Sequence, residues 1–243
     1  MTEAEDGIIT NARQYYEDLK NLYDGASVKI LPRLDEKLRN NKLTIEDTPL
    51  CNVYIRLYLA VGSLLRLNHR KDFQVLASTA RIILELYLDI HLLNRNLIPK
   101  GFEKFKDFGK LKKFDIAKRR RNWAEENNFP YAEKFPKRLA YLKECTSFEE
   151  RIQELWGSQV LNHWTGLDIA SRAKKLGNQF IEYYLLLYDL GNWYIHSGPL
   201  NYVGLDKTTA DLIAGLSYGI VADMFADASQ LCIKNFNLEL DCN

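Results

Sequence analysis

A histidine and an asparagine end the most aromatic stretch of the chain, Asn192 to Ser197 (NWYIHS). Four residues apart on a helix, the side chains of Asn192 and His196 share a face. A histidine titrates near neutral pH and can serve as a general base, while an asparagine can orient it or bind an oxyanion. The same pattern also fits a histidine at a helix C-terminus, which the helix dipole stabilises by about 0.3–1 kcal/mol when the ring is protonated. The spacing therefore indicates either an acid–base site or part of the core.

A charged pair interrupts a very apolar stretch at Arg81 and Glu85. These residues are four apart, so they share a helix face. Burying charges is costly unless they are paired and hydrogen-bonded. The pair is either a structural salt bridge that fixes helix packing, or a site in which Glu85 holds the Arg81 guanidinium towards a phosphate.

His163 opens a second small cluster, His163 to Gly166 (HWTG), between two expected helices. Thr165 fits an N-cap and Gly166 fits a turn. His163 either lines a pocket with Trp164 or is a hydrogen-bonded packing residue. The chain has four histidines, and the other two, His69 and His91, have no comparable context.

Positive charge is concentrated between Lys100 and Arg121, which hold ten Lys or Arg and three Asp or Glu, a balance of +7. The rest of the chain then carries 23 basic and 29 acidic residues, or −6. Phosphates bind cations and bases stack on rings, so this mixture predicts a nucleic-acid surface. The alternative is a solvated face that its phenylalanines anchor to the core. No recognised DNA- or RNA-binding motif accompanies the segment. The predicted phosphate-binding residues are Lys110, Lys112, Lys113, Lys118, Arg119, Arg120 and Arg121, and the interleaved rings are Phe102, Phe105, Phe108, Phe114 and Trp123.

Composition predicts a cytoplasmic protein without a metal or a cofactor. The four cysteines form no CxxC pair and have no metal-ligand spacing with histidine, so we expect free thiols in a reducing compartment. The N-terminus is acidic where a signal peptide is basic and then apolar. Arg56 and Arg66 interrupt the longest apolar stretch, Val53 to Leu67, so we expect no membrane span there.

Apolar residues recur at helical spacing nearly everywhere, and no stretch alternates cleanly as a strand does. We therefore predict an all-α fold: one helical-bundle domain, residues 1–243, of about eight to ten helices. A basic, aromatic-rich helical insertion is expected at 98–128. Gly25 is expected to end the first helix, Thr48 and Asn178 to cap two others. The expected helices are 2–25, 27–40, 48–68, 72–97, 136–144, 147–156, 167–176, 178–196 and 208–235.

The last predicted helix carries Gly215-xxx-Gly219 among further small residues. Small residues at this spacing let two helices approach closely, either in the core or across a dimer. Asp211, Asp223 and Asp227 argue against a membrane helix here.

The order of these motifs resembles an uncharacterised bacterial all-helical family of unknown function over about Gln74 to Ala228. The shared features are Arg81 and Glu85 on a long apolar helix, then His163-Trp164, then a tyrosine-rich helix that closes on His196-Ser197. That family resembles in style the HEPN superfamily. Many HEPN members are metal-independent ribonucleases of toxin and phage-defence systems, and they act as dimers that join two Arg-x(4–6)-His motifs.

The resemblance implies RNA cleavage by the 2′-hydroxyl. His196 would move a proton, Asn192 would position the phosphate, and Arg81 would stabilise the developing charge. Glu85 and His163 would complete the site, and a homodimer would form. Gly191 stands where the HEPN motif has its arginine, which is a departure from the pattern. The alternative is a non-catalytic binding or scaffold module for a nucleotide, a nucleic acid or a protein. The two differ in geometry, since a nuclease needs Arg81, His196 and the basic segment in one cleft, whereas a scaffold leaves Arg81 closed on Glu85.

Overall fold

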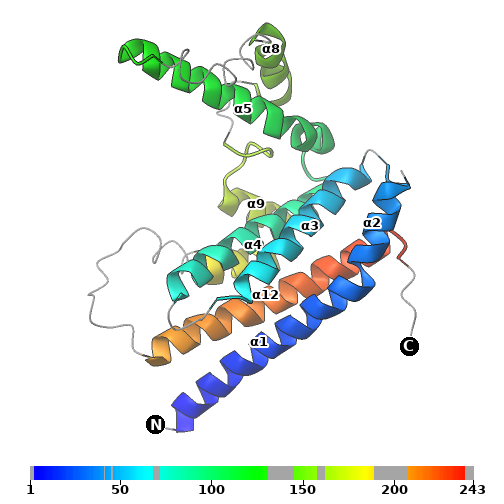
Figure 1. Ribbon diagram of the computed structural model, residues 1–243, viewed down its shortest axis with the longest axis vertical. Helices are drawn as coiled ribbons and strands as arrows, with labels where there is room; N and C mark the ends of the chain where they lie inside the picture. The colour runs from blue at the N-terminus through cyan, green and yellow to red at the C-terminus, as the bar shows by residue number, and fades with distance from the viewer. Residues whose placement is uncertain are drawn as a thin grey trace. The chain divides into compact units, whose positions relative to one another are not determined.

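The computed structural model describes residues 3–40, 42–44, 46–67, 72–130, 145–157, 162–188 and 207–238. All regular secondary structure within these ranges is helical, and none of it is strand (Figure 1). The predicted all-α fold is therefore confirmed.

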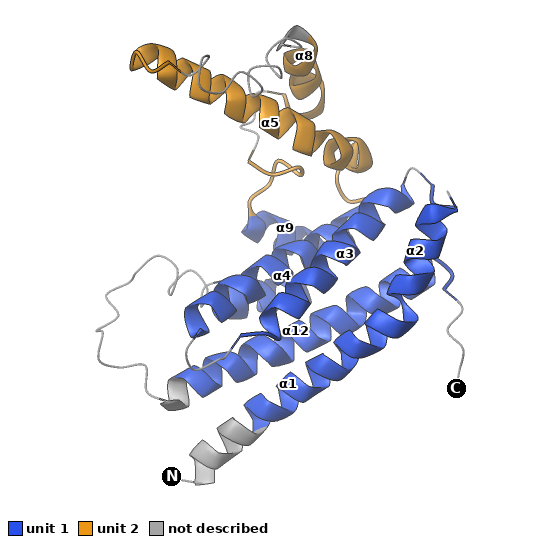
Figure 2. Ribbon diagram, in the orientation of Figure 1, with its two compact units in different colours: residues 1–95, 169–243 blue, residues 96–168 orange. Residues whose placement is uncertain are grey.

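The chain divides into two compact units (Figure 2). Unit 1 comprises residues 1–95 and 169–243, and unit 2 comprises residues 96–168. The predicted insertion, 98–128, lies inside unit 2, which extends further along the chain; that all 243 residues act as one domain stays a prediction. Unit 1 contains α1 (Glu3–Lys29), α2 (Leu31–Arg39), α3 (Asp47–Leu64), α4 (Phe73–Asn94), α9 (Ile169–Leu176), α10 (Asn178–Tyr183), the π-helical turn η2 (Tyr184–Tyr188) and α12 (Lys207–Asn235). Unit 2 contains α5 (Gly101–Glu126) and α8 (Cys145–Trp156).

The core of unit 1 is built around α12, which packs against α1, α3 and α4 (Figure 1). Large rings fill this core: Tyr54, Tyr87, Tyr218 and Phe225 are fully buried. Burying a side chain of this size contributes roughly 1.5–3 kcal/mol. By length and composition alone, α12 is the one helix among the described residues that could cross a membrane, yet most of it is buried inside unit 1, as core helices of globular proteins are.

Helices α1 and α12 run side by side in the same direction. A Cβ atom on Gly215 would lie 3.6 Å from Ala12 Cα, and one on Gly219 would lie 3.5 Å from the Tyr15 ring. Gly215 lies beside Ala12 and Gly219 lies beside Tyr15, so residue numbers increase in the same direction along both helices and the pair is parallel. The close approach predicted from the small residues of α12 is thus found inside unit 1, between α12 and α1.

Several predicted helix boundaries are wrong. Helix α1 does not end at Gly25 but continues to Lys29. Ala26 and Ile30 are buried, and the Ile30 N–H donates to the Ala26 carbonyl at 3.0 Å. The apolar face therefore continues past the glycine, and packing outweighs its weak helix propensity.

Thr48 does not cap α3, which begins one residue earlier, at Asp47. The Asp47 N–H donates to the Thr44 hydroxyl at 3.1 Å, and the Thr44 N–H donates to the Asp47 carboxylate at 2.8 Å. This reciprocal pair has the hydrogen bonds of a capping box, but it lies before the first turn of α3, whose N-cap residue Glu46 makes no side-chain cap hydrogen bond. Asn178 is likewise the first residue of α10, after an N-cap at Gly177, which has a φ of 115°.

The later helices agree more closely with prediction. The structure has α8, α9 and α12 within two residues of the predicted ends, 147–156, 167–176 and 208–235. The predicted helix at 136–144 lies outside the described residues, as does the continuation of the aromatic helix beyond Tyr188.

Candidate functional site

Arg81 and Glu85 form the predicted ion pair on α4. Arg81 Nε lies 3.5 Å from Glu85 Oε1. The Arg81 guanidinium also lies over the Tyr188 ring, 4.2 Å from its centroid, and donates to the Tyr188 hydroxyl at 3.1 Å. The guanidinium is therefore bound by α4 and η2 of its own unit, as the structural alternative expects.

A second arginine, which sequence reasoning missed, completes this cluster. Arg172 on α9 is 3% exposed and donates to Glu85 Oε2 and to Asp89 Oδ1, both at 3.1 Å. One buried guanidinium thus joins two carboxylates that lie one turn apart on α4. The sequence does contain a signal, because Arg172 stands on the same helix face as the buried Ile169, Ala173 and Leu176. A cation in an apolar face predicts a buried partner.

Asn192 and His196 lie outside the described residues. The nearest part of the chain that the structure describes is Tyr188, the partner of Arg81, which precedes Asn192 by four residues. The structure therefore brings Arg81 and Glu85 together, and it adds Arg172 and Asp89 to them.

His163 lies in unit 2 and is held by a turn. Its Nδ1 lies 2.9 Å from the Thr165 hydroxyl and accepts from the Thr165 N–H at 3.3 Å. The Thr165 hydroxyl accepts in turn from the Leu167 N–H at 3.0 Å, while Trp164 is buried. These bonds fit the packing alternative for His163.

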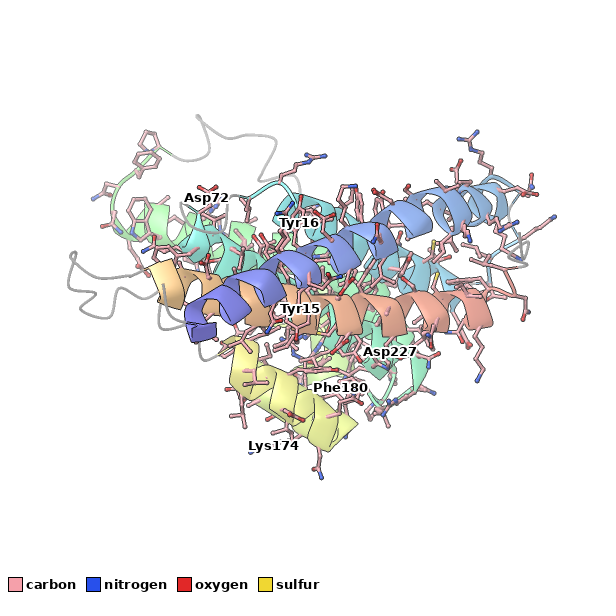
Figure 3. All side chains as sticks on the ribbon, turned by 90° about the horizontal axis from the view of Figure 1, so that it is seen from below. Tyr15, Tyr16, Asp72, Lys174, Phe180 and Asp227 are labelled. Carbon is pink, nitrogen blue, oxygen red and sulfur yellow. The ribbon has the colours of Figure 1, made fainter. Side chains whose placement is uncertain are left out.

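A second cluster in unit 1 lies around His91, a residue the sequence did not single out. His91 is 4% exposed, and its ring meets those of Tyr87 and Phe180 edge-on, with centroids 4.6 Å and 5.0 Å away. Asp227 on α12 accepts from the Tyr87 hydroxyl at 2.6 Å (Figure 3). The same carboxylate oxygen lies 2.9 Å from His91 Nε2.

Burial sets the protonation of this cluster. It lowers the pKa of His91 below the usual 6.5, although the Asp227 carboxylate opposes the shift. It also raises the pKa of Tyr87, which stays a hydrogen-bond donor. At neutral pH the cluster therefore consists of a neutral imidazole, a phenol and the Asp227 carboxylate, and it ties α4 to α12.

The free energy of unfolding is expected to fall as the pH drops below about 6.5. A histidine whose pKa is lowered in the folded state binds its proton more readily when unfolded, so acid favours unfolding. The slope from one such group is at most about 1.4 kcal/mol per pH unit. Urea denaturation between pH 8 and 5 measures this slope, and His91→Gln is expected to flatten it. Identical pH profiles for the wild type and His91→Gln would contradict the assignment.

Most of the predicted phosphate-binding residues of α5 are paired within unit 2. Lys112 and Arg119 contact the Asp115 carboxylate at 3.5 Å and 2.9 Å. Lys118 pairs with Glu149, and Arg121 lies 3.6 Å from Glu125. The Lys110 ammonium lies over the Phe148 ring, 4.6 Å from its centroid. A large part of the local positive charge is thus already balanced.

Two phenylalanines of α5, Phe108 and Phe114, pack against α8. Phe114 is buried in a small core with Phe148, Leu155 and Trp156, and Phe108 packs against it. Arg151 of α8 adds ion pairs with Glu103 at 2.7 Å and Asp107 at 2.8 Å. Phe108 and Phe114 therefore anchor the helix, as the alternative interpretation expects, and do not present rings for stacking.

Three exposed cations of α5 contact neither a carboxylate nor an aromatic ring in the part of the chain that the structure describes. These are Lys106, Lys113 and Arg120, all exposed, which we call the α5 stripe. They are seven residues apart, so they lie on nearly one side of the helix. Trp123, 55% exposed, follows Arg120 by one turn, and its ring centroid is 5.8 Å from that of Phe129. Lys106 was not among the predicted phosphate-binding residues because it precedes the densest run of charge. Its seven-residue spacing from Lys113 could have identified it.

Other nucleophile and metal chemistry has little support among the described residues. Cys51 and Cys232 are buried free thiols, and burial raises the pKa of Cys51 to about 11. No three His, Cys, Asp or Glu side chains gather as metal ligands within the ranges that the structure covers.

Comparison with known proteins gives one match. The profile of a family of unknown function, DUF5677, matches residues 47–209. This range covers 163 of the 243 residues, about two thirds. The chain belongs to the DUF5677 family. The comparisons with curated proteins and with solved structures found no match.

The DUF5677 match confirms the predicted membership of a helical family of unknown function, while the HEPN resemblance stays a prediction. The matched range begins with α3 and ends as α12 begins, so it includes Arg81, Glu85, Arg172 and α5. It leaves out α1 and nearly all of α12.

Proposed function

We propose that this DUF5677 protein binds single-stranded RNA along α5 and needs no catalytic centre to do so. The observation that supports the proposal is the α5 stripe, whose three cations are exposed and contact no carboxylate among the described residues. Carboxylates already neutralise the paired cations of α5, so we expect phosphates to bind the cations of the α5 stripe in preference to them. We expect this binding to take place in the cytoplasm.

The stripe suits an extended polyanion. Its first and last members are fourteen residues apart, a distance of roughly 21 Å along a helix axis. A nucleic-acid backbone that lies along this line would meet three cations and release the counterions condensed on it, which is a favourable and salt-dependent contribution to binding.

Trp123 favours a single strand over a duplex. An exposed ring beside cations can stack on an unpaired base, and such stacking contributes about 1–3 kcal/mol per base. The bases of a duplex are stacked on each other and do not reach it. We expect Trp123→Ala to weaken binding of single-stranded RNA.

The experiment is fluorescence anisotropy with a labelled single-stranded RNA, repeated at several NaCl concentrations and with a duplex of the same sequence as competitor. Saturable binding that weakens steeply with salt, and that the duplex competes for poorly, is the expected result. Absence of binding at low salt, or affinity independent of salt, would overturn the proposal.

A second candidate function, metal-independent RNA cleavage of the toxin or defence type, is favoured by one contact. Arg81 binds Tyr188, and Asn192 and His196 follow Tyr188 by four and eight residues. This contact joins Arg81 to a residue that precedes the candidate base by eight positions in the sequence, which supports a role for the Arg81 guanidinium in cleavage.

His196→Ala is expected to abolish any ribonuclease activity while leaving the far-ultraviolet circular dichroism unchanged, because the variant removes the group that would move the proton. Cleavage of a labelled RNA in EDTA is the measurement, and His69→Ala is the matched control. A His196→Ala protein that cleaves as fast as the wild type would remove His196 from the mechanism.

A further inference from the structure

Two adjoining hollows form a groove along the parallel pair α1 and α12. Tyr15, which is labelled in Figure 3, lines this groove. The two hollows have volumes of about 470 Å³ and about 250 Å³. Both hollows are lined by Leu22 and Ala226, so they meet there. Gly215 and Gly219 line the larger hollow, and neither has a side chain that could fill it.

The groove exposes apolar side chains. Tyr15, Leu22 and Leu212 line it and are 42%, 38% and 47% exposed. Apolar groups grouped in one groove are a typical mark of a protein–protein contact. The residues that line the groove lie outside the range that matches the family profile.

Charge is distributed unequally along the groove. Among the described residues, the larger hollow is lined by the exposed Asp18 and Asp223 and by the buried Asp211, with no Lys or Arg. Within the same described part of the chain, the smaller hollow is lined by Lys29, with no Asp or Glu. One half of the groove is therefore acidic and the other half basic, with Leu22 and Ala226 at the boundary.

We propose that a second copy of this chain occupies the groove and forms an antiparallel two-fold dimer centred on Leu22. In an isologous dimer the same surface meets itself in reverse. The reversal places the acidic half of one copy opposite the basic half of the other, so Lys29 faces the hollow that contains Asp18. It also brings the exposed Leu22 and Tyr15 of both copies out of water.

The charge pattern distinguishes a second copy from other occupants. A basic helix would suit the acidic half but meet Lys29 in the other half, and an acidic helix would have the opposite mismatch. A surface that is acidic at one end and basic at the other complements its own reverse. The interface would lie on α1 and α12 of unit 1, whereas the proposed RNA contacts lie on α5 of unit 2, so the two proposals depend on different residues.

The test begins with the mass of the protein in solution. Light scattering after size exclusion is expected to give twice the 28.3 kDa of one chain. Leu22→Glu would place two carboxylates at the two-fold axis and is expected to raise the dimer dissociation constant at least tenfold. Val28→Glu is the matched control, since Val28 is 73% exposed on the same helix and lines neither hollow.

Charge exchange then tests the antiparallel register. Asp18→Lys alone and Lys29→Glu alone are each expected to weaken self-association, because each puts like charges opposite each other. A mixture of the two variants is expected to form heterodimers, seen by native mass spectrometry, since both contacts between unlike copies are then attractive. Circular dichroism checks that each variant is folded.

Three outcomes would overturn the proposal. The first is a wild type that stays monomeric from nanomolar to submillimolar concentration. The second is a dimer that Leu22→Glu weakens no more than Val28→Glu does. The third is the absence of preferential heterodimers in the mixture of folded Asp18→Lys and Lys29→Glu proteins.

Discussion

Arg172→Ala is expected to lower the free energy of unfolding by about 3–5 kcal/mol. The variant leaves the carboxylates of Glu85 and Asp89 without the guanidinium that now bonds to both at 3.1 Å. Asp89 is 6% exposed, so its charge has little access to water. Breaking a buried pair costs more than the pair contributes, because one charge is left uncompensated. Urea denaturation followed by circular dichroism at pH 7 measures the loss.

Arg81→Ala is the matched control. Arg81 and Glu85 are 23% and 33% exposed, and their contact of 3.5 Å is longer. A partly solvated pair of this kind contributes about 0–1 kcal/mol, although loss of the Tyr188 contact adds to the cost. An apolar replacement of the whole cluster, Arg172→Met with Glu85→Leu and Asp89→Leu, is expected to recover most of the stability lost in Arg172→Ala. Equal losses for Arg172→Ala and Arg81→Ala would contradict the buried-network interpretation.

Replacing the α5 stripe with alanine, in Lys106→Ala, Lys113→Ala and Arg120→Ala together, is expected to weaken binding of single-stranded RNA roughly 10- to 100-fold near 0.1 M salt. Each phosphate contact on a single strand contributes about 0.7 to the slope of log affinity against log salt, so loss of three contacts lowers that slope by about 2. The stripe faces solvent, so the fold is expected to be unaffected.

A second triple variant removes the same formal charge from the same helix. Lys112, Lys118 and Arg119 are bound to Asp115 and Glu149, so their replacement by alanine also releases carboxylates. We expect this paired triple to change the salt slope by less than about 1. The four residues from Lys118 to Arg121 include one member of the stripe, so their joint replacement is expected to act mainly through Arg120.

The helices could be predicted because their signals are local. The amphipathic period of α9 and the Asp72 boundary of α4 depend on residues within a few turns. The errors at Gly25 and Thr48 arose where packing or a nearby hydrogen bond outweighed the local sequence signal. Packing of Ala26 and Ile30 extends α1 past its glycine, and hydrogen bonds between Thr44 and Asp47 place the start of α3 before Thr48.

The candidate sites also differ in whether their contacts are local or distant in the sequence. The pair Arg81 and Glu85 lies within one helix, so its spacing revealed it. Arg172 is 87 residues from Glu85, and Asp227 is 140 residues from Tyr87. The spacing of residues within one helix cannot predict contacts between residues so far apart in the sequence. The arginine in the apolar face of α9 nevertheless indicated a buried partner. On α5, charge counting located the segment, but only the neighbouring carboxylates of α5 and α8 distinguish the stripe from the paired cations.

The most direct test of RNA binding by α5 is a salt titration of single-stranded RNA affinity with three proteins: the wild type, the α5 stripe variant and the paired triple. The predicted result is a salt slope about 2 lower for the stripe variant and nearly unchanged for the paired triple. Equal slopes for the two variants, or a wild type that does not bind RNA at low salt, would contradict it.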